Sequence, residues 1–261
     1  MRRTLVLSGA LLMLSAPLGI AQPRGDLTLG WSNCRVSGFG ADAKTFACNT
    51  NSNAPADVHN LIGAFIAAPG VVALYGADMR VDIYQAAGIT SWWQHTGPPG
   101  GSACRSGSNL SLDFTNVLGA ACANEYWTSI PGGPISGHSY TWPDGPASNA
   151  SLRMVVAVDN GAASAVPPGV ETYLFTAQIR NGLTVGAGAC GGCNVPACIS
   201  FNRAEMLQSN GDDFVITESF QQGPAQTPLS NNAVAWQAVT GCDMVTPVQN
   251  KTWGSIKALY R

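Results

Sequence analysis

The sequence predicts an all-β protein, an antiparallel β-sandwich stapled by disulfides. Apolar and polar residues alternate with a period of two over most of the chain, as in strands with one buried and one solvated face. Clusters of glycine and proline separate these segments, and no convincing amphipathic helix precedes residue 250. Eight cysteines follow an N-terminal export signal, and this even number indicates four disulfides.

The first 21 residues have the features of a secretory signal peptide. Arg2 and Arg3 form a positive start, residues 5–20 are apolar, and small residues precede Gln22. We expect cleavage after Ala21. The alternative, a membrane anchor, is less favoured because the apolar run is short and interrupted by glycine and proline. The mature chain is therefore expected to have no membrane span.

Residues 22–245 are predicted to form the β-sandwich domain, because no repeat or change in composition marks a boundary within them. The clearest alternation covers residues 74–85, where Ala77 and Met79 point to one face and Asp78 and Arg80 to the other. The alternating segments predict strands over residues 27–31, 45–50, 61–67, 74–85, 110–114, 152–158, 171–180, 199–201, 214–217 and 233–239. Short strands joined by Gly/Pro-rich turns favour a sandwich or a barrel.

Residues 246–261 form a C-terminal tail of different character. Trp253, Ile256 and Tyr260 recur at helix-like spacing, and Thr252 is suited to cap the start of a short helix. A helix of this length is not stable alone. We expect the tail either to dock on the sandwich or to be recognised by another molecule.

The charge balance excludes several classes of partner. The formal net charge is −2 and only 11% of the residues are charged. Such a chain has no electrostatic attraction to nucleic acid or to anionic lipid. An extracellular glycan or a surface protein is the kind of partner that remains.

The cysteines are expected to be structural. Proximity in the sequence predicts the disulfides Cys34–Cys48 and Cys104–Cys122, each closing a short loop. The other four would then pair among themselves: Cys190, Cys193, Cys198 and Cys242. A zinc site on these four is disfavoured by export and by the lack of a second Cys-x-x-Cys, and a thioredoxin-like redox pair by the absence of a following helix. We therefore expect no metal and no cofactor, and a clasp around residues 190–199.

Six aromatic residues lie at strand ends and in Gly/Pro-rich loops, and they are the candidate binding residues: Trp92, Trp93, Tyr126, Trp127, Tyr140 and Trp142. Exposed indole and phenol faces stack on sugar rings, which suits an extracellular carbohydrate-binding protein. The simpler interpretation, that these side chains plug the ends of the sandwich, is favoured.

No catalytic residue can be assigned. The mature chain has no complete Gly-x-Ser-x-Gly elbow, and His59, His95 and His138 lack the spacing of metal ligands. A glycosidase needs two facing carboxylates, and nothing in the spacing of the candidates singles out a pair. These candidates are Glu125, Asp144, Glu171, Glu205 and Glu218. The chain is therefore expected not to be an enzyme, with a glycosidase-like secreted hydrolase as the alternative.

Two resemblances add to this interpretation. The order of the strands at residues 77–85, 152–158, 171–180 and 198–205 resembles that of the cohesin-like or immunoglobulin-like sandwiches of bacterial surface proteins. This resemblance implies a fold and no site residue. The segment Trp92-Trp93-Gln94, the pattern C-x-G-C-x-x-P-x-C at residues 190–198 and the pattern TWGxIKxLYR at residues 252–261 are similar to features of uncharacterised secreted bacterial proteins. That similarity implies export.

The sequence as a whole therefore predicts a secreted or cell-surface protein without catalytic activity. It would bind a carbohydrate or a protein, or would serve as a structural component of a surface layer. An exposed aromatic strip would favour binding, a pair of carboxylates in a cleft would favour hydrolysis, and an open edge strand would favour assembly.

Overall fold

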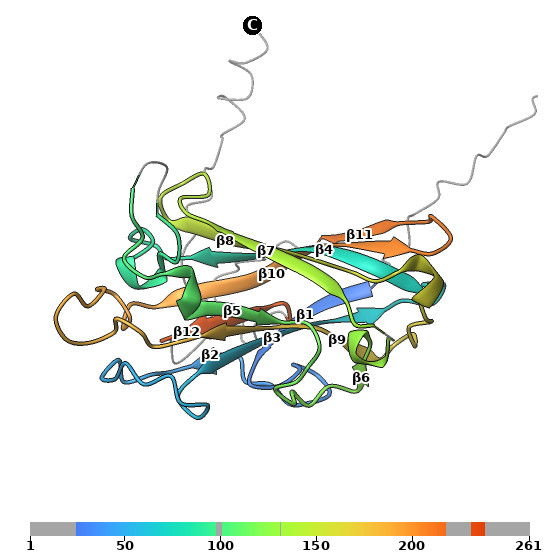
Figure 1. Cartoon of the computed structure of the whole chain (residues 1–261), viewed down its shortest axis with the longest axis horizontal. Helices are drawn as coiled ribbons and strands as arrows, with labels where there is room; N and C mark the ends of the chain where they lie inside the picture. Colours follow the sequence, from blue (N-terminus) through green and yellow to red (C-terminus); the bar gives the residue numbers. More distant parts are fainter. Residues whose placement is uncertain (1–24, 98–100, 131, 218–230, 238–261) are drawn as a thin grey trace, which may run out of the picture.

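Two stacked β-sheets make up the fold in the computed structural model, which describes residues 25–97, 101–130, 132–217 and 231–237 (Figure 1). The predicted signal peptide and the predicted tail, residues 246–261, lie outside these ranges. Four short 3₁₀ helices and no α-helix occur among the described residues: η1 (Ser91–Trp93), η2 (Gly107–Asn109), η3 (Trp127–Ser129) and η4 (Asn160–Ala162). The predicted all-β sandwich with disulfides is confirmed.

The five-stranded sheet has the order β1-β3-β9-β5, with β6 pairing in parallel with β9. Its strands are β1 (Gly25–Trp31), β3 (His59–Ala67), β5 (Leu110–Asp113), β6 (Asn124–Glu125) and β9 (Glu171–Ile179). The three other pairings in this sheet are antiparallel.

The seven-stranded sheet has the order β2-β12-β10-β4-β8-β7, with β11 also pairing with β10. Its strands are β2 (Ala43–Lys44), β4 (Leu74–Tyr84), β7 (Ile135–Thr141), β8 (Asn149–Ala157), β10 (Ala197–Gln208), β11 (Phe214–Thr217) and β12 (Ala233–Trp236). Only the short β2–β12 pairing is parallel. The central strand β4 is antiparallel to both β8 and β10.

The main core lies between the two sheets. The Phe175 ring of β9 meets the Phe201 ring of β10 edge to face, with centroids 5.4 Å apart. Gly63 on β3 makes room for this packing, because a Cβ atom there would lie 2.1 Å from the Phe175 ring. The inner faces of β4 and β8 supply the alternating apolar residues that the sequence indicates, such as Met79 and Met154.

A second, smaller core lies on the outer face of the five-stranded sheet. It consists of Cys34, Ile62, Ala64, Ala120 and Tyr173, with Cys122 packed against it. Ile62, Ala64 and Tyr173 come from the sheet, and the others come from two loops. These loops therefore cover part of a sheet face that would otherwise be open to solvent.

The strand predictions differ from the structure at three places, one of which is the two-residue strand β6, which was not predicted. Residues 45–50 form no strand, and β2 lies just before them at Ala43–Lys44. The strand β7 was not predicted, because five of its seven residues are exposed and Gly137 interrupts its middle. A strand at the end of a sheet need not alternate between buried and exposed residues, so it leaves little pattern in the sequence.

None of the helices within the described ranges is long and apolar enough to cross a membrane.

Candidate functional site

Five of the six aromatic residues predicted for binding are buried. Trp92, Trp93 and Trp127 have no exposed surface, and Tyr126 and Tyr140 are at most 8% exposed. Trp142 is half-buried and packs against the main core. Stacking on sugar rings requires exposed faces, so the five buried rings are corrected from binding residues to core residues that fill the ends of the sandwich.

The ring cluster at one end is organised around Trp92. This indole stacks on Trp236, with centroids 5.0 Å apart and planes 20° apart, and it meets Trp93 edge to face. The Nε1 atom of Trp92 donates to the hydroxyl of Thr184 at 2.9 Å. The phenol of Tyr140 donates to the carbonyl of Trp93 at 2.5 Å. The polar atoms of Trp92 and Tyr140 thus fix the cluster internally.

Arg105 is a fully buried cation within this cluster. Its guanidinium carbon lies 4.1 Å from the centroid of the Trp92 ring, and the side chain donates to the carbonyls of Trp92 and Arg180. Burial lowers the pKa of Arg105 from 12.5 to about 9. Burial, followed by the charge of Arg105, also lowers the pKa of His95 to about 3. Burial thus disfavours the charged form of both side chains, and neither of them reaches solvent.

The disulfides join different cysteines from those that proximity predicted. Cys34 bonds to Cys122, Cys48 to Cys193, and Cys104 to Cys190. The predicted Cys34–Cys48 and Cys104–Cys122 bridges are wrong. Neither Cys190 nor Cys193 pairs within the cluster, and their bonding to distant cysteines also rules out a zinc site that needs both thiolates. Cys198 is also disulfide-bonded, and Cys242 lies outside the described residues.

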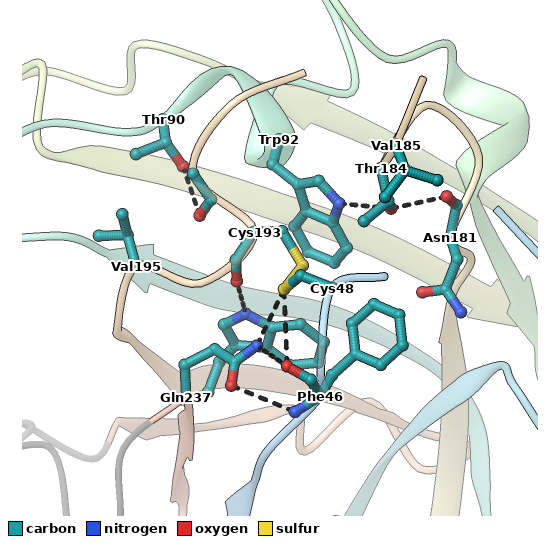
Figure 2. Close-up of a disulfide and its surroundings, with 12 residues drawn as sticks. Phe46, Cys48, Thr90, Trp92, Asn181, Thr184, Val185, Cys193, Val195 and Gln237 are labelled. Atoms are coloured by element: carbon teal, nitrogen blue, oxygen red, sulfur yellow. Dashed lines mark hydrogen bonds between the residues drawn. A yellow bond between two sulfur atoms is a disulfide. The ribbon is translucent and has the colours of Figure 1, made fainter. Parts of the chain in front are cut away.

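The Cys48–Cys193 bridge lies directly against the ring cluster (Figure 2). The indole of Trp236 donates to the carbonyl of Cys193 at 2.7 Å. Gln237 accepts from the backbone N–H of Phe46 at 3.1 Å and donates back to its carbonyl at 2.6 Å (Figure 2). Residues 190–193 therefore hold residues 46–48 and 104–105 through disulfides, whereas the prediction paired the cysteines of this segment with each other and with Cys242.

The carboxylates considered for hydrolysis are occupied by other contacts. Arg80 binds Asp82 at 2.7 Å and Asp144 at 2.8 Å, and Arg203 binds Glu205 at 2.7 Å. The side chain of Glu125 accepts from Asn116, which belongs to one of the covering loops. Glu218 lies outside the described residues. A facing pair of free carboxylates is therefore not found among those that are described.

Glu171 organises a loop instead of facing a cleft. Its carboxylate is 3% exposed and accepts from the hydroxyl of Thr28 at 2.6 Å, from the backbone N–H of Val36 and Ser37, and from the Ser37 hydroxyl at 2.7 Å. A carboxylate with this many donors is fully satisfied. It fixes residues 36–37 against the outer face of the five-stranded sheet.

The hollows lined by described residues include two that lie near the predicted cysteine and strand segments, and neither of these two presents a free acid–base pair. One lies over the Cys48–Cys193 bridge and is lined by small and neutral side chains such as Thr184 and Asn194. The other lies on the outer face of the seven-stranded sheet beside Asp82, whose oxygens accept from Arg80 and Asn202. The histidines His59, His95 and His138 line neither hollow.

The most exposed aromatic side chain of the described residues is one that the sequence analysis did not select. Phe39 is 90% exposed. It lies in residues 32–41, which together with residues 114–123 form the loops over the small core. We call these two loops the loop platform. They also carry three exposed aliphatic side chains, Val36, Val117 and Leu118, at 46%, 79% and 41%.

The two loops of the platform are firmly joined. The Cys34–Cys122 disulfide links them, and Ala121 N–H donates to the side chain of Asn33 at 3.0 Å. Ala123 N–H donates to the hydroxyl of Ser37 at 3.0 Å. Gly38 approaches so closely that a Cβ atom there would lie 2.0 Å from the carbonyl oxygen of Ala121. The apolar side chains are thus presented on a fixed backbone.

Asn116 holds the second loop in shape. Its side chain accepts from the N–H of Ala120 at 2.8 Å and donates to the Ala120 carbonyl at 3.0 Å, and it donates to Glu125 at 2.7 Å. Val117 and Leu118 lie inside the turn that these bonds close. The sequence carries a signal for both loops, an apolar residue flanked by turn-forming residues in Gly38-Phe39-Gly40 and in Asn116-Val-Leu-Gly119.

A comparison with protein-family models and with curated proteins gave no match. Among solved structures, the chain is similar to a cohesin module of a family 33 glycoside hydrolase from Clostridium perfringens, with 10% identity, 82% of this chain and 97% of that chain covered, and a TM-score of 0.39.

Two further similar structures are cohesin modules of Acetivibrio cellulolyticus. The second type II cohesin of an adaptor scaffoldin has 11% identity, 73% and 89% coverage and a TM-score of 0.35. The sixth cohesin of scaffoldin B, solved in complex with a dockerin, has 9% identity, 80% and 96% coverage and a TM-score of 0.31. At these values the likeness concerns general architecture alone.

Proposed function

We propose that the chain is a non-catalytic binding module of the extracellular space or cell surface, that its partner is a protein, and that the loop platform is the binding surface. The observation that carries this proposal is Phe39, a phenyl ring that is 90% exposed on a backbone held in place from several sides. Scattered apolar side chains on a surface are ordinary, but four of them on two short cross-linked loops are a concentration that is typical of a binding surface.

The backbone at Phe39 supports a binding role. Its φ angle is +53°, in the left-handed region that bulky residues avoid. A conformation of this kind costs about 1 to 2 kcal/mol and persists only where its surroundings impose it. Gly38 and Gly40 flank the residue, and a glycine at position 39 would remove the cost. The chain instead keeps a ring there that makes little contact with its own core.

Rigidity of the platform also favours affinity. Association costs free energy for every loop and side chain that must be ordered on binding. The disulfide, the Glu171 carboxylate and the Asn116 side chain have already ordered these loops. An aromatic anchor surrounded by smaller contacts is the usual arrangement of the residues that dominate protein–protein affinity.

A protein partner fits the platform better than a glycan does. The other exposed apolar residues of the platform are aliphatic, namely Val36, Val117 and Leu118. Sugar sites combine stacking rings with several polar side chains that bind hydroxyl groups. An extracellular location agrees with the disulfides, which persist in oxidising compartments.

The proposal is tested by selecting peptides from a display library on the full chain and measuring their affinity for variants. The Phe39→Gly variant removes the ring and suits the local φ angle, so it keeps the fold. We expect it to bind the selected peptides at least about tenfold more weakly. The control Val215→Ser, which changes a side chain that is 49% exposed on β11, should bind within about twofold of the parent.

Equal binding by the parent and by Phe39→Gly would contradict the proposed surface. A glycan array probed with the same variants addresses the other class of partner, because a glycan that binds the parent and not Phe39→Gly would make the platform a sugar site. Turnover of glycoside substrates by the parent chain would contradict the non-catalytic function.

A further inference from the structure

Among the described residues, the strand β7 lies at the end of the seven-stranded sheet and pairs with β8 alone. It pairs with β8 through seven consecutive residue pairs, from Ile135–Ala157 to Thr141–Ser151, without a bulge. Natural edge strands are usually protected by charged residues, by proline, by a bulge or by being very short. The sequence Ile-Ser-Gly-His-Ser-Tyr-Thr of β7 contains no proline and no acidic residue, lysine or arginine.

The neighbouring hydrogen bonds show which backbone groups of β7 face outward. Val158 N–H donates to the carbonyl of Tyr75, just inside β4, at 2.8 Å, so the even-numbered residues of β8 face β4 and the odd-numbered ones face β7. In the β7–β8 register, odd-numbered residues of β7 lie opposite odd-numbered residues of β8 and form the hydrogen bonds between the two strands. The even-numbered residues Ser136 and His138 therefore direct their backbone N–H and C=O groups away from β8. The hydroxyl of Thr96, which donates to the carbonyl of Tyr140 at 3.1 Å, agrees with this assignment.

We propose that β7 pairs antiparallel with the β7 of a second copy of the chain, about a twofold axis at Gly137. In this register, Ser136 of each copy opposes His138 of the other, and each such pair exchanges two backbone hydrogen bonds. The outward-facing backbone N–H and C=O groups of Ser136 and His138, for which the described residues provide no hydrogen-bond partner, are thus paired with one another. Tyr140, whose carbonyl is already bonded to Thr96, is not needed.

The side chains near the axis suit a copy of themselves. Ile135 is 83% exposed and Val155 is 51% exposed, and both lie on the outer face of the sheet beside Gly137. A Cβ atom at Gly137 would have only Val155 near it, at 3.7 Å. Ile135 of one copy therefore lies diagonally across from Gly137 of the other copy. Because Gly137 has no side chain, Ile135 can cover Val155 on the neighbouring strand of that other copy.

Charge does not oppose this pairing. The exposed cation on the adjacent strand β8 is Arg153. In the dimer, the two β7 strands lie between Arg153 of one copy and Arg153 of the other. Three strand spacings amount to about 14 Å, which exceeds the Debye length of about 8 Å at physiological ionic strength. The interface is small, so we expect a weak dimer that dissociates on dilution.

A cysteine at the axis tests the register directly. The Gly137→Cys side chain has space and, at the non-hydrogen-bonded position facing its own copy, a Cα separation of about 4.5 Å that allows a disulfide. We expect the oxidised full chain to form a covalent dimer on a non-reducing gel. The matched control Ser139→Cys opposes Ile135 and should remain largely monomeric. Failure of Gly137→Cys to cross-link, or equal cross-linking by both variants, overturns the proposal.

A second experiment measures association without a new cysteine. In His138→Pro, the lost N–H is one that faces away from β8, so the fold tolerates it while strand addition is blocked. Sedimentation equilibrium of the full chain should give a dimer dissociation constant at least about tenfold higher for His138→Pro, and within about threefold of the parent for His138→Ala. A parent that is monomeric up to about 1 mM, or an equal dimer in His138→Pro, overturns the proposal.

The proposed function and this inference fail separately. Phe39→Gly should dimerise as the parent does, because Phe39 belongs to the loop platform and not to β7. A loss of the dimer in Phe39→Gly would assign self-association to the platform and overturn the role of β7.

Discussion

Glu171 and Arg105 show how single polar residues are used in this molecule. The carboxylate of Glu171 accepts hydrogen bonds from four donors and thereby fixes a loop. Arg105 donates hydrogen bonds to two backbone carbonyls within the ring cluster. Their residue types are the ones that sequence analysis associates with catalysis or with binding to anions. Their burial and their partners give both of them structural roles instead.

His95 gives the protein a sensitivity to acid. Its pKa is lowered to about 3, first by burial and then by Arg105, whereas an unfolded histidine titrates near 6.5. The unfolded chain therefore binds the extra proton between pH 6.5 and 3. Stability is complete above about pH 6.5 and is lost as the pH falls through this window. The lowered pKa of His59, about 4 and caused mainly by burial, acts in the same direction.

We expect the free energy of unfolding, measured in urea, to fall between pH 7 and pH 5. The share of His95 is about 2 kcal/mol. A His95→Phe variant keeps an aromatic ring beside Tyr140, whose centroid is 5.2 Å away, and removes the titration. Its stability should fall by about 2 kcal/mol less over the same pH range. An unchanged pH dependence in His95→Phe would contradict the burial of a neutral imidazole.

At the scale of elements, the sequence predicted the strands that have one buried face. The alternation at residues 74–85 and 171–180 corresponds to β4 and β9, because burial on one side imposes a period of two. It did not predict β7, whose exposed residues are under no such constraint. The loop platform was missed as well, since its four apolar residues are informative only once their exposure is known.

The Cys34–Cys122 disulfide is the covalent link between the two loops of the platform. Replacing both Cys34 and Cys122 by serine should lower the free energy of unfolding by about 2 to 4 kcal/mol, because the bridge closes a loop of 88 residues. We expect faster amide hydrogen exchange in residues 33–40 and 116–123, with little change in β4 and β10. The matched double variant at Cys104 and Cys190 should leave exchange in the platform unchanged.

Equal acceleration of exchange across both sheets in the Cys34/Cys122 variant would mean that the bridge supports the whole sandwich rather than the platform. The binding of selected peptides should weaken along with the faster exchange, because the loops would then have to be ordered on binding.

For the whole molecule, the sequence was sufficient for the class of fold and insufficient for its connections. Alternation, turn residues and the number of cysteines describe local features. Cys48 and Cys193 are 145 residues apart, and only the stacking of the sheets brings them together. The burial of Trp92 and Trp127 is likewise a property of the assembled sandwich, which an aromatic residue in a loop does not reveal by itself.

The complete disulfide pattern can be checked by mass spectrometry of peptides from the unreduced chain. We expect Cys34–Cys122, Cys48–Cys193 and Cys104–Cys190. Cys198 is bonded as well, and counting the eight cysteines predicts Cys242 as its partner. A thiol titration in denaturant should find no free thiol. Recovery of a Cys34–Cys48 peptide as the main product would contradict the structure.

The order of the cysteines along the chain also has a consequence for how the protein matures. Cys34 must bypass Cys48 and Cys104 before it reaches Cys122, and Cys48 must wait for Cys193. A chain oxidised in the order in which it enters an oxidising compartment would first join neighbours that do not belong together. Any early bond of that kind would have to be exchanged before the native pairs form, a step of seconds to hours without an isomerase. We therefore expect oxidative refolding of the reduced chain to be faster with a thiol–disulfide exchange catalyst than without one.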